Sequence, residues 1–479
     1  MRLDQRFTNL KMLHKSKAIM LPRAFKQRIS ALSNSGTTLR GGVARGAIGS
    51  FGLQVIEAGL GFLTSIVLAR ALGVAEYGIY AFAIAFAGFL TFPALLGHDS
   101  LSVKQCSKLA AVQAWPRLRA FLNGARRRVL FSSLIVTASG FAFLLVARSS
   151  LTPGIQDAAR ISLVMVPVVA LLRLHEGFLR GIGRVTTAQF PDKALRPGLF
   201  LAVALAANLY FEDFRLGAEA VLLNLVATTL GFFAVLGLWY RYRPEQVLHA
   251  PADPEGDKGI GQALPFALLA GLSVINTQTD VLMLGFLGTP EDVGFYRIAS
   301  RVSSLVAFAL TAVAATLAPR VAALHATGSR SEMQNLASKA ALATTAFALP
   351  MALVLVFGGN WVLFLFGEEF QRGATALAIL SFGQLINATA GAAGVFLTMT
   401  GHHALVARTL TFSALLNIAL NAALIPSFGA SGAAIATATT YLTWNVALVF
   451  LVKSELRINT TVFNLRRRSP RRDEAKTSR

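Results

Sequence analysis

The sequence predicts an all-α integral membrane protein with about twelve transmembrane helices in two six-helix lobes. Apolar residues make up 54% of the chain and charged residues only 14%, with a mean hydropathy of +0.58. Because soluble proteins carry about 25% charged residues, much of the surface of this protein is expected to face lipid. Apolar stretches of membrane-spanning length recur along the chain, and one short motif at their borders occurs twice.

The apolar stretches define the expected helices in order. A window of about 20 residues, enough to cross a bilayer, selects six spans for a first lobe: 47–69, 78–97, 129–148, 158–178, 194–211 and 217–239. It selects six more for a second lobe: 263–287, 294–318, 340–360, 373–399, 407–425 and 431–452. The lobes are therefore predicted at 47–239 and 263–452, with a polar cytoplasmic linker at 240–262.

Basic tails flank the two lobes at residues 1–46 and 453–479. The first 40 residues lack the apolar core of a signal peptide, so they are expected to form a cytoplasmic tail. Most of the 45 Lys and Arg residues fall in these tails and in alternate loops on the same side. Since cytoplasmic loops carry such an excess, both termini are predicted to be cytoplasmic. The net charge of +22 then reflects topology and does not indicate nucleic-acid binding.

The stretch at 100–128 mixes apolar and basic residues between two spans. It is expected to lie on the inner leaflet, as amphipathic helices do. It contains the only cysteine of the sequence, Cys106, so no internal disulfide can form. No group of metal-ligating residues is apparent in the sequence, and a metal site is not expected.

The repeated motif lies in the outer hairpin that follows the first span of each lobe. The first copy is "LGVAEYGIY" (72–80) and the second is "LGTPEDVGFY" (287–296). Each copy holds Leu-Gly, then an acid, Glu76 or Glu291, and then Gly-x-Tyr. Six spans separate the copies, so the two lobes are expected to run parallel, related by an axis along the membrane normal.

Four stretches, taken together in this order, resemble one family of membrane proteins. They are "ARALGVAEYGIY" (69–80), "LLRLHEGFLRGIGRVTTAQFPDKALRPGLF" (171–200), "LINATAGAAGVFLTMTGHHALVARTL" (385–410) and "GASGAAIATATTYLTWNVALV" (429–449). Over roughly residues 40–455 the chain resembles oligosaccharide flippases. These form the Wzx-type, polysaccharide-biosynthesis branch of the multidrug/oligosaccharidyl-lipid/polysaccharide exporter superfamily.

The resemblance implies a V-shaped pair of lobes that works by alternating access. Such a protein moves an undecaprenyl-diphosphate-linked glycan from the cytoplasmic to the outer leaflet for O-antigen, capsule or exopolysaccharide assembly. It implies a multi-pass protein of a bacterial inner membrane, with the polysaccharide polymerase and export machinery as candidate partners. No cofactor is implied, and coupling to H⁺ or to Na⁺ stays open.

Charged residues inside the spans are the candidate site residues, because a charge at mid-bilayer costs about 2.5–3.5 kcal/mol. Arg173, Glu176 and Arg180 form one stripe on the fourth span. Arg297 and Arg301 share a face of the eighth span. Since the fork of an arginine side chain suits phosphate oxygens, these arginines are the predicted contacts to a diphosphate.

Three acids are candidates for ion pairs or for coupling. Glu57 has no obvious partner in the first span, so it is either a protonatable coupling group or a neutral acid hydrogen-bonded between helices. Asp280 comes out at a depth similar to that of Arg301 on the next helix, so the two could neutralise each other. Glu176 and Arg180 lie near the inner interface, where long side chains reach water.

Polar residues inside the spans are expected to face a cavity rather than lipid. The run "NTQTD" (276–280) is the most polar of these stretches. Amides such as Gln384, Asn417 and Asn421 suit either sugar hydroxyl groups or hydrogen bonds between helices, and both interpretations stay open.

Other function classes fit the sequence less well. An ATP-driven pump needs a phosphate-binding loop with a Gly-Lys pair, and the chain contains no such pair. A membrane-embedded sugar polymerase needs a large outer loop for its catalytic groups, but the outer loops are short, so an enzyme is not expected. A cation-coupled drug antiporter of the same superfamily is the alternative; its lumen would favour carboxylates over the arginines found here.

Overall fold

The computed structural model describes residues 36–210, 215–251, 253 and 259–462. The predicted terminal tails therefore lie largely outside the described residues. The chain divides into two units, Met1–Gly52 and Leu53–Arg479, and the described part of the first unit is helical. Within the second unit we refer to residues 53–253 as the first half and to residues 259–462 as the second half.

The described residues are almost entirely helical and contain no β-strand. The helices up to the end of the first half are α3 (Gly36–Leu95), α4 (His98–Ala111), α5 (Trp115–Val146), α6 (Pro153–Gly181), α7 (Val185–Phe190), α8 (Arg196–Tyr210), α9 (Gly217–Tyr242) and α10 (Glu245–His249). A 3-10 turn, η1 (Ala147–Ser150), extends α5, and a π-helical turn, η2 (Pro191–Leu195), joins α7 to α8.

The second half continues with helices of similar length. They are α11 (Gly259–Leu287), α12 (Pro290–Ser303), α13 (Phe308–Ala326), α14 (Arg330–Phe357), α15 (Gly359–Phe364), α16 (Ala374–Thr389), α17 (Ala393–Met399) and α18 (His403–Glu455). The 3-10 turns η4 (Ser304–Ala307) and η5 (Glu368–Gly373) lie after α12 and before α16.

Seven helices in the described part are long and apolar enough to cross a membrane. An eighth span results if the segments Glu368–Thr389 and Ala393–Met399, which meet at a bend of 44°, are taken together. The predicted spans overlap these helices over most of their described residues, and the span predicted at 373–399 is interrupted at residues 390–392. The count of twelve spans stays a prediction. The protein is thus a multi-pass, all-α membrane protein, as its composition predicts.

The chain reverses direction within α3, at Gly73. This residue has φ 74°, a backbone conformation that glycine adopts without steric cost. Gly61 touches Arg301, and Tyr80 lies close to the same side chain. A straight helix of this length would hold Gly61 and Tyr80 about 28 Å apart, so the two parts of α3 run antiparallel. They correspond to the first two predicted spans.

A second reversal divides α18 at Gly429, whose φ is 52°. Asn417 and Asn421, before it, and Thr437, after it, all donate hydrogen bonds to Asp280. A straight helix would separate Asn421 from Thr437 by about 24 Å. The two parts of α18 therefore also run antiparallel, and they correspond to the last two predicted spans.

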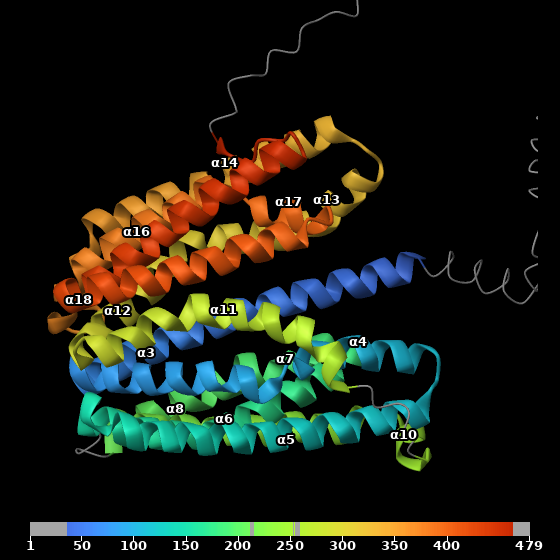
Figure 1. The fold of residues 1–479 in the computed structure, drawn as a ribbon, viewed down its shortest axis with the longest axis horizontal. Coiled ribbons are helices and arrows are strands. Elements are labelled where there is room, and N and C mark those ends of the chain that lie inside the picture. The colour runs from blue at the N-terminus through green and yellow to red at the C-terminus, as the bar shows by residue number, and fades with distance from the viewer. Residues whose placement is uncertain (1–35, 211–214, 252, 254–258, 463–479) are drawn as a thin grey trace, which may run out of the picture. The chain divides into compact units, whose positions relative to one another are not determined.

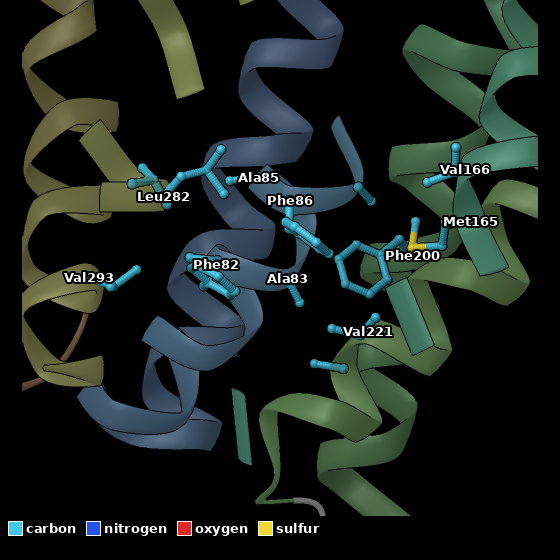
Figure 2. Close-up of a cluster of buried hydrophobic side chains, with 14 of the residues drawn as sticks. Phe82, Ala83, Ala85, Phe86, Met165, Val166, Phe200, Val221, Leu282 and Val293 are labelled. Carbon is cyan, nitrogen blue, oxygen red and sulfur yellow. The ribbon is translucent and has the colours of Figure 1, made fainter. Parts of the chain in front are cut away.

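The second part of α3 lies at the border of the first half and packs against α11 of the second half. Helices α4 to α10 lie on one side of α11, and α13 to α18 lie on the other (Figure 1). Figure 2 shows Phe82 and Phe86 of α3 between Leu282 of α11 on one side and Phe200 of α8 on the other. Phe82 is fully buried and meets Phe286 edge to face, with ring centroids 5.5 Å apart. Aromatic packing of this kind joins the halves.

Candidate binding cavity

The two copies of the repeated motif pack against each other. A Cβ atom added at Gly78 would overlap the carbonyl group of Pro290, and one added at Gly294 would overlap that of Val74. Each glycine therefore lets the backbone of its own copy touch the backbone of the other copy. The first and second halves are in direct contact along these hairpins.

The acid of each copy binds the start of a helix in its own half. Glu76 Oε2 accepts a hydrogen bond of 2.7 Å from the backbone N–H of Gly217, where α9 begins. Asp292 Oδ1 accepts one of 3.0 Å from the N–H of Ala430, directly after the break in α18. Carboxylates stabilise such helix starts. The prediction that Glu291 matches Glu76 is thus wrong, because the second copy holds one extra residue before its acid.

The tyrosine of each copy contacts the helix whose start is bound by the acid of that copy, two turns further along. Asn224 Nδ2 of α9 donates to Tyr80 Oη at 2.9 Å. Thr437 Oγ1 of α18 lies 2.9 Å from Tyr296 Oη. The two halves therefore repeat a whole set of contacts, and in the second half this set borders a cavity.

The cavity has a volume of about 290 Å³ and lies mainly among helices of the second half. Its lining is polar: α11, α12, η4, α16 and the second part of α18 contribute Asn276, Thr277, Gln278, Arg297, Ser300, Arg301, Ser304, Gln384 and Tyr441. The "NTQTD" run thus faces a cavity, as its polarity predicts. Two of the predicted site arginines lie together in the same lining.

Arg301 extends from this cavity to α3 in the first half. Its guanidinium group lies directly against Gly61, where a Cβ atom would overlap Nη2. Tyr77, Tyr80 and Glu57 of α3 are also close enough to interact with it electrostatically. Within the described residues, Arg301 forms no ion pair, so its N–H groups are available to an anion. Arg297, one turn earlier on α12, also forms no ion pair within the described residues.

Asp280 lies in the wall of the cavity and is only 4% exposed. Its Oδ1 accepts hydrogen bonds from Asn417 Nδ2 at 3.0 Å and from Asn421 Nδ2 at 2.7 Å. Its Oδ2 accepts from Tyr296 Oη at 2.6 Å and from Thr437 Oγ1 at 2.9 Å. Four donors thus stabilise the carboxylate, as hydrogen bonds to a charged form do.

The alternative in which Asp280 and Arg301 neutralise each other does not match this geometry. Both residues line the cavity, but no ion pair joins them in the described part of the chain. The donors to Asp280 are neutral side chains instead. One oxygen of this cluster, Asn421 Oδ1, is buried and has no hydrogen-bond partner among the described residues, so the cluster has an acceptor to offer a further ligand.

Glu57 has a partner that the sequence did not reveal. Lys193 Nζ lies 2.6 Å from Glu57 Oε2, so Glu57 forms an ion pair and is not the neutral, hydrogen-bonded acid of the second alternative. A coupling role for Glu57 stays a prediction. Lys193 belongs to the π-helical turn η2, a rare geometry that occurs often at functional sites. The signal available in the sequence was the polar, proline-containing stretch at 189–197 between two apolar segments.

The remaining predicted residues lie on α6, away from the cavity. Arg173 and Arg180 are exposed, while the Glu176 side chain is largely buried. Arg180 Nη1 lies 3.8 Å from Glu176 Oε1, a long ion pair one turn apart on the same helix. Since Glu176 interacts electrostatically with Lys193, these residues form a second charged group, in the first half.

Comparisons with known proteins agree with this architecture. Residues 43–325 match the family described as "Polysaccharide biosynthesis protein", and residues 265–423 match MatE. A protein of Haloferax volcanii named "Probable low-salt glycan biosynthesis flippase Agl15" is 24% identical over 417 residues, which cover 83% of this chain and 81% of that protein. The "Probable flippase AglR" of the same organism is 27% identical over 161 residues, which cover 33% and 34%.

Solved structures share the fold at low sequence identity. An inward-facing multidrug resistance MATE family transporter of the MOP superfamily has a TM-score of 0.65 at 15% identity, covering 86% of this chain and 98% of its own. The lipid II flippase MurJ, in an inward closed conformation, has a TM-score of 0.64 at 15% identity, covering 86% and 87%. Since the first family match spans more than half of the chain, the protein belongs to the family described as "Polysaccharide biosynthesis protein".

Proposed function

We propose that the protein is a flippase that moves a lipid-diphosphate-linked oligosaccharide from the cytoplasmic to the outer leaflet. The observation that carries this proposal is a pair of arginines, Arg297 and Arg301, in the lining of a polar cavity. Arg301 also touches Gly61 of the other half. Cationic forks beside hydroxyl and amide groups suit a diphosphate attached to a sugar. The names of the Haloferax relatives support the same function.

The membrane potential would assist this direction of transport. A diphosphate carries about two negative charges, and an inside-negative potential is worth roughly 2.3 kcal/mol per charge per 100 mV. The field therefore drives the head group outward, provided that cations in the cavity offset its desolvation. Arg297 and Arg301 would supply them in the second half, and Arg173 and Arg180 on α6 would form an earlier contact in the first half.

The proposed architecture is twelve spans in two six-helix lobes, with both termini in the cytoplasm. It is supported by contacts that occur in both halves. Gly78 and Gly294 each let the two hairpins touch. Glu76 accepts a hydrogen bond from the N–H of Gly217, as Asp292 does from the N–H of Ala430. The proposed location is a bacterial inner membrane. The substrate would be an undecaprenyl-diphosphate-linked glycan, and the polymerase and export machinery of the same pathway would be the partners.

Asp280 is the proposed site of coupling to Na⁺ or H⁺. Hard cations take oxygen ligands, and Asp280 and Thr437 offer three oxygens within one cluster. Turning over the Asn421 amide would add its unpartnered Oδ1. We expect Asp280→Asn to remove the dependence of transport on a Na⁺ or pH gradient, whereas Asp157→Asn, at an exposed pair on α6, should retain it. An unchanged gradient dependence in Asp280→Asn would exclude this site.

A drug antiporter is the second candidate function, since the fold alone does not assign a substrate. One assay separates the two: purified protein in vesicles is offered a fluorescent lipid-diphosphate glycan or a cationic dye, and leaflet sidedness is measured by quenching from outside. The flippase proposal expects movement of the glycan lipid and none of the dye. Movement of the dye alone would favour the antiporter.

A further inference from the structure

A second cavity, distant in sequence from the first, lies where α5, α9 and α10 meet. It has a volume of about 140 Å³. Its lining includes Arg119 and Arg126 of α5 and Trp239 and Arg243 at the end of α9, and it contains no carboxylate of the described residues. We refer to it as the arginine cavity. Three like charges around one small space repel one another unless an anion joins them.

Three donors of the arginine cavity have no acceptor among the described residues. Within that part of the chain, Arg126 Nη2, Arg243 Nε and Trp239 Nε1 are all buried without a hydrogen-bond partner, and Trp239 is only 1% exposed. Leaving a buried donor unpaired costs about 1–3 kcal/mol, and more when it is charged. Three such groups around one cavity are therefore a strong indication of a ligand that accepts hydrogen bonds.

Other contacts hold these donors in place. Arg126 Nε donates to His175 Nε2 at 3.2 Å, and its guanidinium group lies over the Trp239 ring at 5.8 Å. Arg243 lies over the Tyr240 ring at 4.4 Å. Arginine stacked in this way keeps its N–H edge available for planar hydrogen bonding. The arrangement is thus preorganised before any ligand binds.

We infer that the arginine cavity binds a phosphate-type oxyanion. This site is separate from the proposed transport pathway and is not required by it. A phosphate group offers several acceptor oxygens and negative charge to the three donors, whereas a single water accepts only two hydrogen bonds and leaves the arginine charges unbalanced. The predicted topology places these helix ends on the cytoplasmic side, where basic pockets between helices bind anionic lipid head groups.

The phosphate could belong to a membrane lipid or be free in solution. A groove of about 550 Å³ on the neighbouring face of α5 is lined by Arg127 together with the apolar side chains Leu130, Phe131 and Leu134. Phe131 is 68% exposed. A basic cavity and an exposed apolar groove on the same helix suit a phospholipid with its acyl chains, so the experiment includes a lipid arm and a phosphate arm.

The test measures the thermal unfolding midpoint of the full-length protein in a neutral detergent. Phosphatidylglycerol, phosphatidylcholine or inorganic phosphate is titrated, because a ligand that binds the folded state raises the midpoint. The variants are Arg243→Gln and Trp239→Phe, which remove one donor each. Arg126→Gln is a third variant, and the matched control is Arg241→Gln, an exposed arginine of α9 outside the cavity.

We expect phosphatidylglycerol, phosphate or both to raise the midpoint of the wild type and of Arg241→Gln, and phosphatidylcholine to have no such effect. The apparent Kd should weaken about tenfold or more in Arg243→Gln, since a hydrogen bond to a charged group is lost. A response to the lipid alone identifies a head group, and a response to phosphate alone identifies the free anion. If Arg243→Gln and Trp239→Phe respond like the wild type, or if no anion raises the midpoint, the inference is wrong.

Discussion

At the scale of single residues, Arg301 is the most informative side chain. It lines the cavity in the second half and touches Gly61 in the first. We expect Arg301→Ala to lower glycan-lipid transport about tenfold or more, because hydrogen bonds from a charged donor are worth about 1.5–3 kcal/mol. Arg301→Lys should retain part of the activity, since the charge survives without the fork. Vesicle transport assays, normalised to the amount of inserted protein, measure both effects.

The matched control for Arg301 is Arg160→Ala. Arg160 lies on the exposed surface of α6, paired with Asp157 at 2.9 Å, and exposed pairs of this kind contribute at most about 1 kcal/mol. Its replacement should leave transport near the wild-type rate. Full transport by Arg301→Ala at normal protein levels would show that the phosphate contact lies elsewhere.

The arginines of the cavity could be predicted because a charge inside an apolar span is rare and costly. The partners of the acids could not. Lys193 pairs with Glu57 across 136 positions of sequence, and only the fold brings the π-helical turn to α3. Likewise, the sequence places Asp280 at a depth similar to that of Arg301, which suggests an ion pair. In the structure, the two parts of α18 instead provide neutral hydrogen-bond donors to Asp280.

At the scale of helices and hairpins, the two glycine contacts determine whether the halves can close. We expect Gly294→Val to prevent the approach of the two motif hairpins, because a side chain would overlap the backbone at Val74. Spin labels at Arg215 and Glu291, both exposed and in different halves, should show a longer or broader distance distribution in this variant, and most transport should be lost.

Gly59→Ala is the matched control for this prediction, since nothing lies within 4 Å of a Cβ atom at Gly59. It should leave both the label distances and transport unchanged. A Gly294→Val protein with wild-type distances would show that the hairpins do not limit closure.

The motif repeat itself was visible in the sequence because its Gly-x-Tyr spacing is the same in both copies. The register of the acids was not, since one extra residue in the second copy makes Asp292, and not Glu291, the equivalent of Glu76. A shift of one residue changes the helix face, so only the folded structure identifies which acid reaches the next helix start.

At the scale of the whole molecule, Cys106 provides an inert background for labelling. It is fully buried, and burial raises the pKa of its thiol to about 12. The thiol is therefore protonated at neutral pH, and it is the thiolate that reacts. We expect a maleimide to leave the native wild-type protein unlabelled at pH 7 and to label it once in SDS. Labelling of the native protein would mean that α4 opens readily.

This background permits a direct test of the twelve-span topology. The loop between α13 and α14 contains the exposed Thr327, and the region between α15 and α16 contains the exposed Glu368. Because an excess of Lys and Arg marks the cytoplasmic side, Thr327→Cys should react with a membrane-impermeant maleimide only after the cells are opened. Glu368→Cys should react in intact cells, as should Thr152→Cys between α5 and α6 in the first half. Thr152→Cys and Glu368→Cys react from the same side of the membrane only if an even number of spans separates the two positions, as two parallel lobes require. Opposite labelling of Thr152→Cys and Glu368→Cys would exclude that architecture, whatever the family.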